Sequence, residues 1–320
     1  MTTAGKSLRN NDLDIVTIGH TSIDNIEIGG ESKRQLGGAA VYSAMAAKVF
    51  GKTGIVSRVG MDFPPSFLKI LTETGISTTG IRKINGNSTF FSIEYNGSGS
   101  ANYKGFKLNA GRNISAEDIP ISFLNAKGFH IAPMNPGKQR RIVDFLRAHS
   151  YGVVSLNTYM GYAHQHKKAL LELMDIVDIF TINDEEAMLL ADSKSFEHAL
   201  EKIKKVPHNL VIITMGVYGS IVLSDSEINF FPSVYQERVV DLTGCGDSFA
   251  GSFLASYLKT NDPHKSANIA NSVASLNATD WNYQALKPLE FRSLEKFQLF
   301  ITSRQRRLTK QQKMLEAFFK

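Results

Sequence analysis

Cysteine, tryptophan and long apolar runs are scarce in this chain. Its 320 residues include one cysteine, Cys245, and one tryptophan. A single cysteine excludes an internal disulfide and fits a reducing compartment. No stretch approaches the roughly 18 uninterrupted apolar residues of a membrane-spanning helix, and residues 1–10 are too polar for a signal peptide. We therefore expect a cytoplasmic protein with no membrane partner.

Acidic residues are nearly absent from the C-terminal end. Residues 304–320 contain six basic side chains and one acidic side chain, Glu316. They carry a net charge of +5 out of the total of +6, so the rest of the chain is close to neutral. Such a terminal run is more often a solvated end than a nucleic-acid site. We expect a basic tail over residues 301–320 and no nucleic-acid partner.

The chain does contain a regular alternation of short β-rich runs and helical patterns. Apolar, β-branched runs predict strands at residues 14–18, 54–59, 128–132, 152–156, 176–182, 211–214, 220–223 and 228–231. Apolar spacing predicts helices at 39–50, 63–74, 138–148, 164–174 and 184–191. With 42% hydrophobic residues, the chain can fill the core of one large domain. We predict an α/β fold with a mainly parallel central sheet and helices on both faces.

Two segments interrupt this alternation and contain no crossover helix. The first, at about residues 24–37, contains a miniature hairpin that turns at Gly29 and Gly30. The second, residues 88–108, begins with a strand in which four side chains share one face: Thr89, Phe91, Ile93 and Tyr95. We expect both hairpins to project from the main sheet as a small β lid. An exposed lid face would also suit a homodimer contact.

A glycine turn before a helix carries the clearest chemical signal. Gly244 and Gly246 lie between residues 238–240, which are predicted to end a strand, and a helical pattern over residues 248–259. Free amides at a helix start bind anions, phosphate above all. Asp247 in the same turn would repel a resting phosphate, but it could take a proton from a hydroxyl that attacks one. The alternative is that Asp247 only caps the helix.

A second glycine pair precedes the helix near the N-terminus. Asp24 follows the first predicted strand, and Gly37 and Gly38 open the helix. Ligands of open α/β sheets bind beyond the carboxyl ends of the strands. Asp24 could therefore accept hydrogen bonds from substrate hydroxyls, while the glycines let backbone amides approach a sugar-like ring. A turn aspartate and an ordinary helix entry are the alternative.

Five elements in order resemble the signature of the ribokinase-like (PfkB) carbohydrate kinases. They are the Gly-Gly pair, residues 59–63, residues 183–186, Thr214-Met215-Gly216 with Gly219, and residues 241–247. The resemblance runs from about residue 13 to about 285. It implies a ribokinase-like kinase domain over residues 12–300, with the hairpins as its lid.

The resemblance implies a role for each matching residue. Asp247 would be the base that deprotonates the acceptor hydroxyl, and the amides of Gly244, Cys245 and Gly246 would form an anion hole for the transferred γ-phosphoryl group. The Mg²⁺ element, with its waters, would be Asn183 and Glu186. The residues that match nucleotide positions are Thr214, Gly216, Gly219, Thr243 and Asn271. Asp241 and Thr243 lie at positions where some members of the family bind a monovalent cation.

Departures from the family pattern concern the acceptor. Tyr42 stands where ribokinases have a sugar-binding asparagine, and Asn157 replaces the usual aspartate yet could contact a hydroxyl or phosphate. The compact spacing from Asp24 to Gly37 is similar to that of the inositol-kinase branch. Cys245 replaces the common alanine; a helix start lowers a thiol pKa, so thiol reagents could block the hole, although a small buried hydrophobe is the simpler interpretation.

These observations predict an ATP-dependent, Mg²⁺-requiring kinase that phosphorylates a hydroxyl of a small sugar or cyclitol. A nucleoside kinase of the same family is the alternative within the enzyme class. A pocket face able to stack a base would favour it, and Phe91 and Tyr95 on the lid are the candidate aromatics. A kinase-fold binding protein without chemistry is the alternative from another class.

Overall fold

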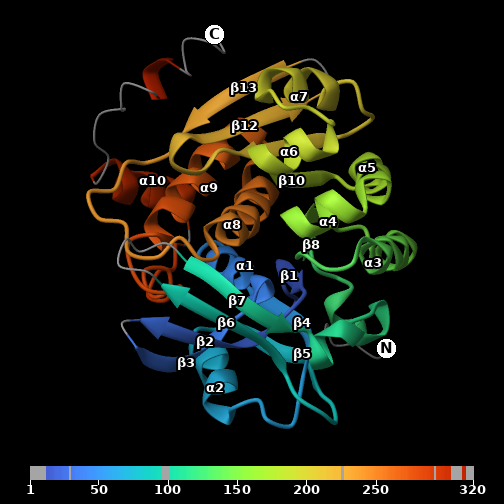
Figure 1. Cartoon of the computed structure of the whole chain (residues 1–320), viewed down its shortest axis with the longest axis vertical. Helices are drawn as coiled ribbons and strands as arrows, with labels where there is room; N and C mark the ends of the chain where they lie inside the picture. The colour runs from blue at the N-terminus through green and yellow to red at the C-terminus, as the bar shows by residue number, and fades with distance from the viewer. Residues whose placement is uncertain are drawn as a thin grey trace, which may run out of the picture.

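A computed structural model describes residues 12–28, 30–95, 101–224, 227–291, 293–303 and 312–314. Its strands form two sheets, one of nine strands and one of four (Figure 1). The large sheet has the order β13-β12-β11-β10-β9-β8-β1-β4-β5, and the small sheet has the order β3-β2-β6-β7. The predicted α/β architecture with a separate β lid is confirmed.

The large sheet is parallel except at one edge, where β12 runs antiparallel to both β11 and β13. Its strands are β1 Ile15–Ile18, β4 Thr53–Val59, β5 Ser77–Lys83, β8 Gly128–Ile131, β9 Val153–Asn157, β10 Ile179–Asn183, β11 Leu210–Thr214, β12 Gly219–Ser224 and β13 Glu227–Pro232. The central strands β1 and β8 are buried at every residue. Continuous burial is expected of parallel strands that are covered on both faces, and it explains their unbroken apolar sequences.

Helices cover the large sheet in two layers that contribute to separate core clusters. One cluster contains the buried faces of α3 Pro136–His149, α4 Met160–Gln165, α5 Lys167–Ile176, α6 Asp184–Leu190 and α7 Phe196–Ile203. The other layer contains α1 Ala39–Ala47, α2 Pro65–Glu73, α8 Cys245–Thr260, α9 Pro263–Asn277 and α10 Leu294–Thr302. In open α/β sheets of this kind, ligands bind beyond the carboxyl ends of the parallel strands.

The lid is a mixed four-stranded sheet built from two hairpins. Its strands are β2 Ser22–Ile28, β3 Glu31–Gly37, β6 Thr89–Tyr95 and β7 Ala101–Lys107. The hairpins join through parallel pairing of β2 with β6, which aligns Asp24 with Phe91. Phe91 in turn lies opposite Phe106 on β7. Paired residues point to the same face of a sheet, so these three side chains form one row across the lid.

Several local predictions need correction. Residues 238–240 form no strand; Val240 N instead donates to Ala278 O, so this segment is held by the end of α9. The helix predicted at 164–174 is two helices that meet at His166. Turn residues Gly29 and 96–100, and all of the basic tail except residues 301–303 and 312–314, lie outside the described residues. None of the helices within the described ranges is long and apolar enough to cross a membrane.

Candidate functional site

The glycine turn ends in a left-handed residue, from which α8 begins. Gly244 has φ 70° and precedes Cys245, the first helical residue. A Cβ on Gly244 would lie 2.1 Å from a ring carbon of Tyr42, whereas a Cβ on Gly246 would meet nothing within 4 Å. Gly244 is therefore required both by its backbone conformation and by the ring beneath it. Gly246 faces open space that a phosphoryl group could fill.

Not all of the expected amide donors are free. Cys245 N donates to Leu242 O at 3.3 Å, so one of the three amides expected in the anion hole is already used within the turn. The first-turn amides of Gly246 and Asp247 have no acceptor within the described residues, as helix geometry requires. With Gly244 N they point from the start of a 16-residue helix. The loop keeps the partial positive charge that binds anions.

Asp247 is joined to the end of a neighbouring strand. Asn157, the last residue of β9, donates from Nδ2 to Asp247 Oδ1 at 2.9 Å. Loss of solvent raises the pKa of Asp247 to about 6, and the hydrogen bond from Asn157 opposes that rise. No local pattern predicts a protein partner for this carboxylate, and Asn157 supplies one. A carboxylate that ionises near neutrality suits proton transfer from an alcohol.

The thiol of Cys245 behaves differently from the expectation for a helix start. Burial raises its pKa to about 11, opposed by a hydrogen bond from Asn277, and the charges of Asp241 and Asp247 add to the rise. Asn277 Nδ2 lies 3.6 Å from Sγ. Desolvation and two nearby carboxylates outweigh the helix dipole. The raised pKa agrees with the simpler interpretation of Cys245 as a small buried hydrophobe and disfavours its reaction with thiol reagents.

Asn183 and Glu186 form a reciprocal cap at the start of α6. Asn183 Oδ1 accepts from Glu186 N at 2.7 Å, and Glu186 Oε2 accepts from Asn183 N at 3.0 Å. Burial raises the pKa of Glu186 to about 7, and the nearby charge of Asp247 adds to the rise. The described residues contain no cluster of three or more metal-ligating side chains. One buried carboxylate beside a phosphate site still fits Mg²⁺, which keeps several waters and binds phosphate oxygens.

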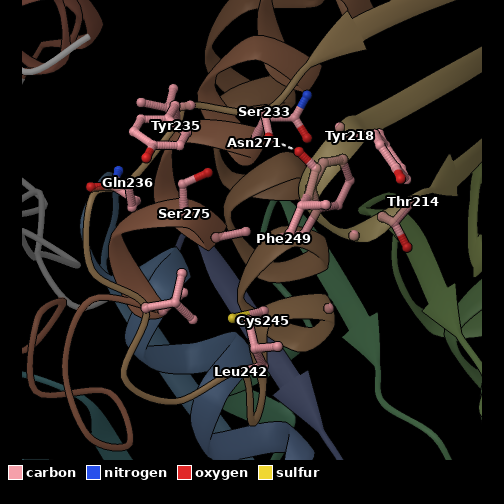
Figure 2. Close-up of a pocket in the computed structure, with 18 of the residues that line it drawn as sticks. Thr214, Tyr218, Ser233, Tyr235, Gln236, Leu242, Cys245, Phe249, Asn271 and Ser275 are labelled. Carbon is pink, nitrogen blue, oxygen red and sulfur yellow. Dashed lines mark hydrogen bonds between the residues drawn. The ribbon is translucent and has the colours of Figure 1, made fainter. Parts of the chain in front are cut away.

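A cavity of about 400 Å³ lies between the end of β11 and the start of α8 (Figure 2). Its walls include four of the residues predicted at the nucleotide, namely Thr214, Gly216, Gly219 and Asn271. Asn271 Nδ2 donates to Ser220 Oγ and Phe231 O, so this amide fixes the wall and is not directed at a ligand. Cys245 and Gly246 line the same cavity, which therefore reaches the turn at residues 243–246, called the anion loop below.

The sequence did not predict most of the apolar wall of this cavity. The additional lining residues include Val217, Tyr218, Tyr235, Val239, Leu242 and Phe249. Gln312, from the C-terminal tail, also lines it and donates to Ser233 O at 3.1 Å and Ser233 Oγ at 3.0 Å. No local pattern marks Gln312, because it reaches the cavity from outside the motif-bearing region. Thr243, which the sequence also assigned to the nucleotide, is not among the residues that line this cavity.

On the lid side, Asp24 is a buried carboxylate with few donors. It is 3% exposed, and Ser22 Oγ donates to its Oδ1 at 2.6 Å. Its Oδ2 accepts no hydrogen bond from the described residues, and the absence of a side chain on Gly37 leaves room for this atom. Burial raises the pKa of Asp24 to about 7, an effect opposed by Ser22 and increased by Asp241. Hydroxyl donors from a ligand would satisfy it.

Tyr42 does not occupy the place that the sequence suggested. Its side chain is 2% exposed, and its ring lies beneath Gly244 and edge-on to Tyr283 at 5.9 Å. The ring therefore supports the anion loop from below and offers no surface to a substrate. Gly38, the other glycine of the pair, has φ 100° and lies against His20 O, so it shapes the chain before α1.

Asp241 is enclosed by protein donors. Its Oδ1 accepts from Tyr95 OH at 2.6 Å and from Thr243 N at 2.8 Å, while Oδ2 accepts from Asn282 N at 2.9 Å. Tyr95 OH also lies 2.6 Å from Thr243 Oγ1. Tyr95 is therefore not available to stack on a base. Three protein donors therefore surround the Asp241 carboxylate, the group that the family resemblance assigned to a monovalent cation together with Thr243.

The site thus brings together a helix start with free amides, a carboxylate with a raised pKa and a cavity of about 400 Å³. The family model described as pfkB family carbohydrate kinase matches residues 9–288, and the chain belongs to this family. The protein is therefore a phosphotransferase that binds ATP and uses an alcohol group as acceptor. This confirms the predicted family and reaction class.

Named relatives include nucleoside kinases. A cytidine kinase from Thermococcus kodakarensis is 31% identical over 249 residues, which cover 77% of this chain and 88% of the relative. A nucleoside kinase from Methanothermobacter thermautotrophicus is 26% identical over 303 residues, which cover 89% of this chain and 96% of the relative. The solved adenosine kinase from Sinorhizobium meliloti has a TM-score of 0.79 at 20% identity and covers 90% of this chain and 100% of that chain.

Proposed function

We propose that this protein is a nucleoside kinase, which transfers the γ-phosphoryl group of ATP to a ribose hydroxyl of a nucleoside. The observation that carries the proposal is the row of Asp24, Phe91 and Phe106 on one face of the lid. A carboxylate beside an aromatic pair offers one group for sugar hydroxyls and another for a base.

The dimensions of this row suit a nucleoside. Neighbouring strands lie about 4.8 Å apart, so the aromatic residues lie one and two strands away from Asp24. The rings of Phe91 and Phe106 are stacked, with centroids 5.9 Å apart and an interplanar angle of 28°. Phe106 is 56% exposed, which is unusual for a phenylalanine and leaves a ring face for a ligand. A base would stack there while Asp24 Oδ2 accepts from the ribose.

The row faces the anion loop. Tyr95 shares its strand face with Phe91, since the two positions differ by four residues, and Tyr95 reaches Thr243 next to Gly244. The same lid face therefore overlooks the anion loop. A ribose held by Asp24 would present a hydroxyl toward Asp247.

In the proposed reaction, ionised Asp247 takes the proton of the attacking hydroxyl as the oxygen approaches the γ-phosphorus. The amides of Gly244, Gly246 and Asp247 stabilise the charge on the transferred group, and they do so without reorganisation because the helix start fixes them. Glu186, with water and the Asn183 cap, would hold Mg²⁺, which neutralises phosphate charge when bound. ATP would occupy the 400 Å³ cavity, with its phosphates toward Gly246.

The relatives support the nucleoside alternative better than the sugar or cyclitol acceptor expected from the sequence. That expectation depended on the short spacing between Asp24 and Gly37, which fixes the length of one hairpin and not the shape of the acceptor. A catalytically silent protein is disfavoured because Asp247 and the open space at Gly246 are both retained.

A substrate panel tests the proposal. With ATP and Mg²⁺, we expect phosphorylation of cytidine, inosine or adenosine at a kcat/KM at least tenfold above that of ribose, fructose or myo-inositol. Preference for a free sugar or a cyclitol would refute it. Loss of base stacking in Phe106→Ala should raise the KM for the nucleoside by about 5- to 100-fold and leave the KM for ATP unchanged. Lys107→Ala, an exposed neighbour on the opposite lid face, is the matched control.

A further inference from the structure

Asp241 connects the lid to the anion loop from a fully buried position. Asp241 is 1% exposed, and its two carboxylate oxygens accept hydrogen bonds from three donors in different parts of the chain. Tyr95 comes from the last position of lid strand β6, and Thr243 N comes from the turn itself. Asn282 adds a second path, because its Nδ2 donates to Leu36 O on lid strand β3 at 2.9 Å. Both lid hairpins are thereby tied to one carboxylate.

The Tyr95 hydroxyl is the shortest of these links. It lies 2.6 Å from Asp241 Oδ1 and 2.6 Å from Thr243 Oγ1, and Thr243 directly precedes Gly244. A separation of 2.6 Å lies at the short end of the range for a hydroxyl donor to an oxygen acceptor. The ring is anchored independently, since it packs edge-on against Trp281 with centroids 5.1 Å apart. The hydroxyl can therefore be removed without removing the packing.

We propose that Tyr95 is a positioning residue that sets the anion loop only when the lid lies on the site. With the lid down, the Tyr95 hydroxyl fixes Asp241 and Thr243, and these fix the turn from which the phosphate-binding amides start. With the lid raised, the Tyr95 hydroxyl leaves, so that Asp241 Oδ1 loses one of its two donors and Thr243 Oγ1 loses its contact with the lid. Phosphoryl transfer is thus confined to the closed state, from which water is excluded as a competing acceptor.

This coupling uses the family reaction and not the identity of the acceptor. It would hold equally for a sugar or a nucleoside, so failure of the nucleoside proposal leaves it intact. It also accounts for Asp241, which the sequence offered only as a cation ligand, through donors that are present in the fold.

The test compares Tyr95→Phe with wild type in two assays, ADP release and formation of phosphorylated acceptor. We expect kcat for the acceptor to fall about tenfold and the ratio of ADP released to acceptor phosphorylated to rise above one, because water competes in a loosened site. If Tyr95 had a merely structural role, the rate of ADP release and the rate of acceptor phosphorylation would fall by the same factor. Tyr151→Phe, which removes a hydroxyl from a fully exposed tyrosine, should match wild type in both assays.

A double-mutant cycle adds a second criterion. Thr243→Val removes the other hydroxyl of the pair, and a lid–loop link requires that Tyr95→Phe has a smaller effect on kcat in that background than in wild type. Unchanged kcat and a coupling ratio of one in Tyr95→Phe would overturn the proposal. The proposal would also be overturned if the factors by which the two substitutions lower kcat simply multiply in the double mutant. A requirement for potassium together with a wild-type kcat in Tyr95→Phe would overturn it as well.

Discussion

The hydrogen bond between Asn157 and Asp247 leads us to predict how the activity depends on pH. As the base, Asp247 must be ionised, so kcat/KM should fall as the pH is lowered through its pKa of about 6. Burial raises this pKa and the Asn157 amide opposes the rise. Removing the amide in Asn157→Ala therefore removes a stabiliser of the ionised form. The acidic limb of the profile should move to higher pH.

The size of the shift follows from the geometry of the contact. A hydrogen bond of 2.9 Å to a carboxylate contributes roughly 1.5 to 3 kcal/mol to the charged form. One pH unit corresponds to about 1.4 kcal/mol, and water that enters the space left by the side chain recovers part of the loss. We expect the midpoint of the acidic limb to move to higher pH by about 1 pH unit. Activity at pH 6.5 should fall more than activity at pH 8.5.

The assay is steady-state kcat/KM from pH 5 to pH 9 at saturating ATP. Asn209→Ala is the control, because it deletes an amide donor to Val177 O at the amino end of strand β11, away from the open end of the sheet. A limb in Asn157→Ala that stays in place or moves to lower pH would show that this amide does not set the ionisation of the base. The reasoning about Asp247 would then be wrong.

Three further predictions concern the loop and the cavity. Asp247→Asn should lower kcat by about 10² to 10⁴, or roughly 3 to 5 kcal/mol of barrier, with little change in ATP affinity; a loss under threefold in steady-state rates would contradict the assignment. Gly244→Ala should lower the free energy of unfolding by at least ~2 kcal/mol, because of its positive φ and the ring beneath it, whereas Gly246→Ala should unfold like wild type and lose turnover; denaturant titrations and rates separate the two. Gln312→Ala should raise the KM for ATP about three- to tenfold, while Lys313→Ala should not; equal KM values in the two variants would contradict its place in the cavity wall.

The elements that depend on local pattern were predictable. Apolar runs identified the strands of the parallel sheet because burial on both faces makes their sequences continuously hydrophobic. The glycine turn was predictable because a positive φ at Gly244 restricts the residue type. The lid hairpins were visible because each lacks a crossover helix.

The features that the sequence missed depend on contacts between distant segments. Tyr95 meets Asp241 across 146 positions, and Asn157 meets Asp247 across 90, so neither pair leaves a local signal. For Cys245 the sequence left two interpretations open, a thiol with a lowered pKa and a small buried hydrophobe, because the two influences on its pKa oppose each other. A helix start lowers a thiol pKa, whereas burial raises it, and only the fold determines which effect is larger.

The parallel pairing of β2 with β6 also bears on how the molecule reaches its native state. Ser22 is aligned with Thr89, and the intervening chain contributes α1, α2 and two strands of the large sheet. Closing so large a loop costs entropy that is recovered only after the intervening elements have packed. The groups that would hold the acceptor should therefore come together late in folding. A folding intermediate that stops before that stage could have an ordered large sheet with its helices and still be unable to bind the acceptor substrate.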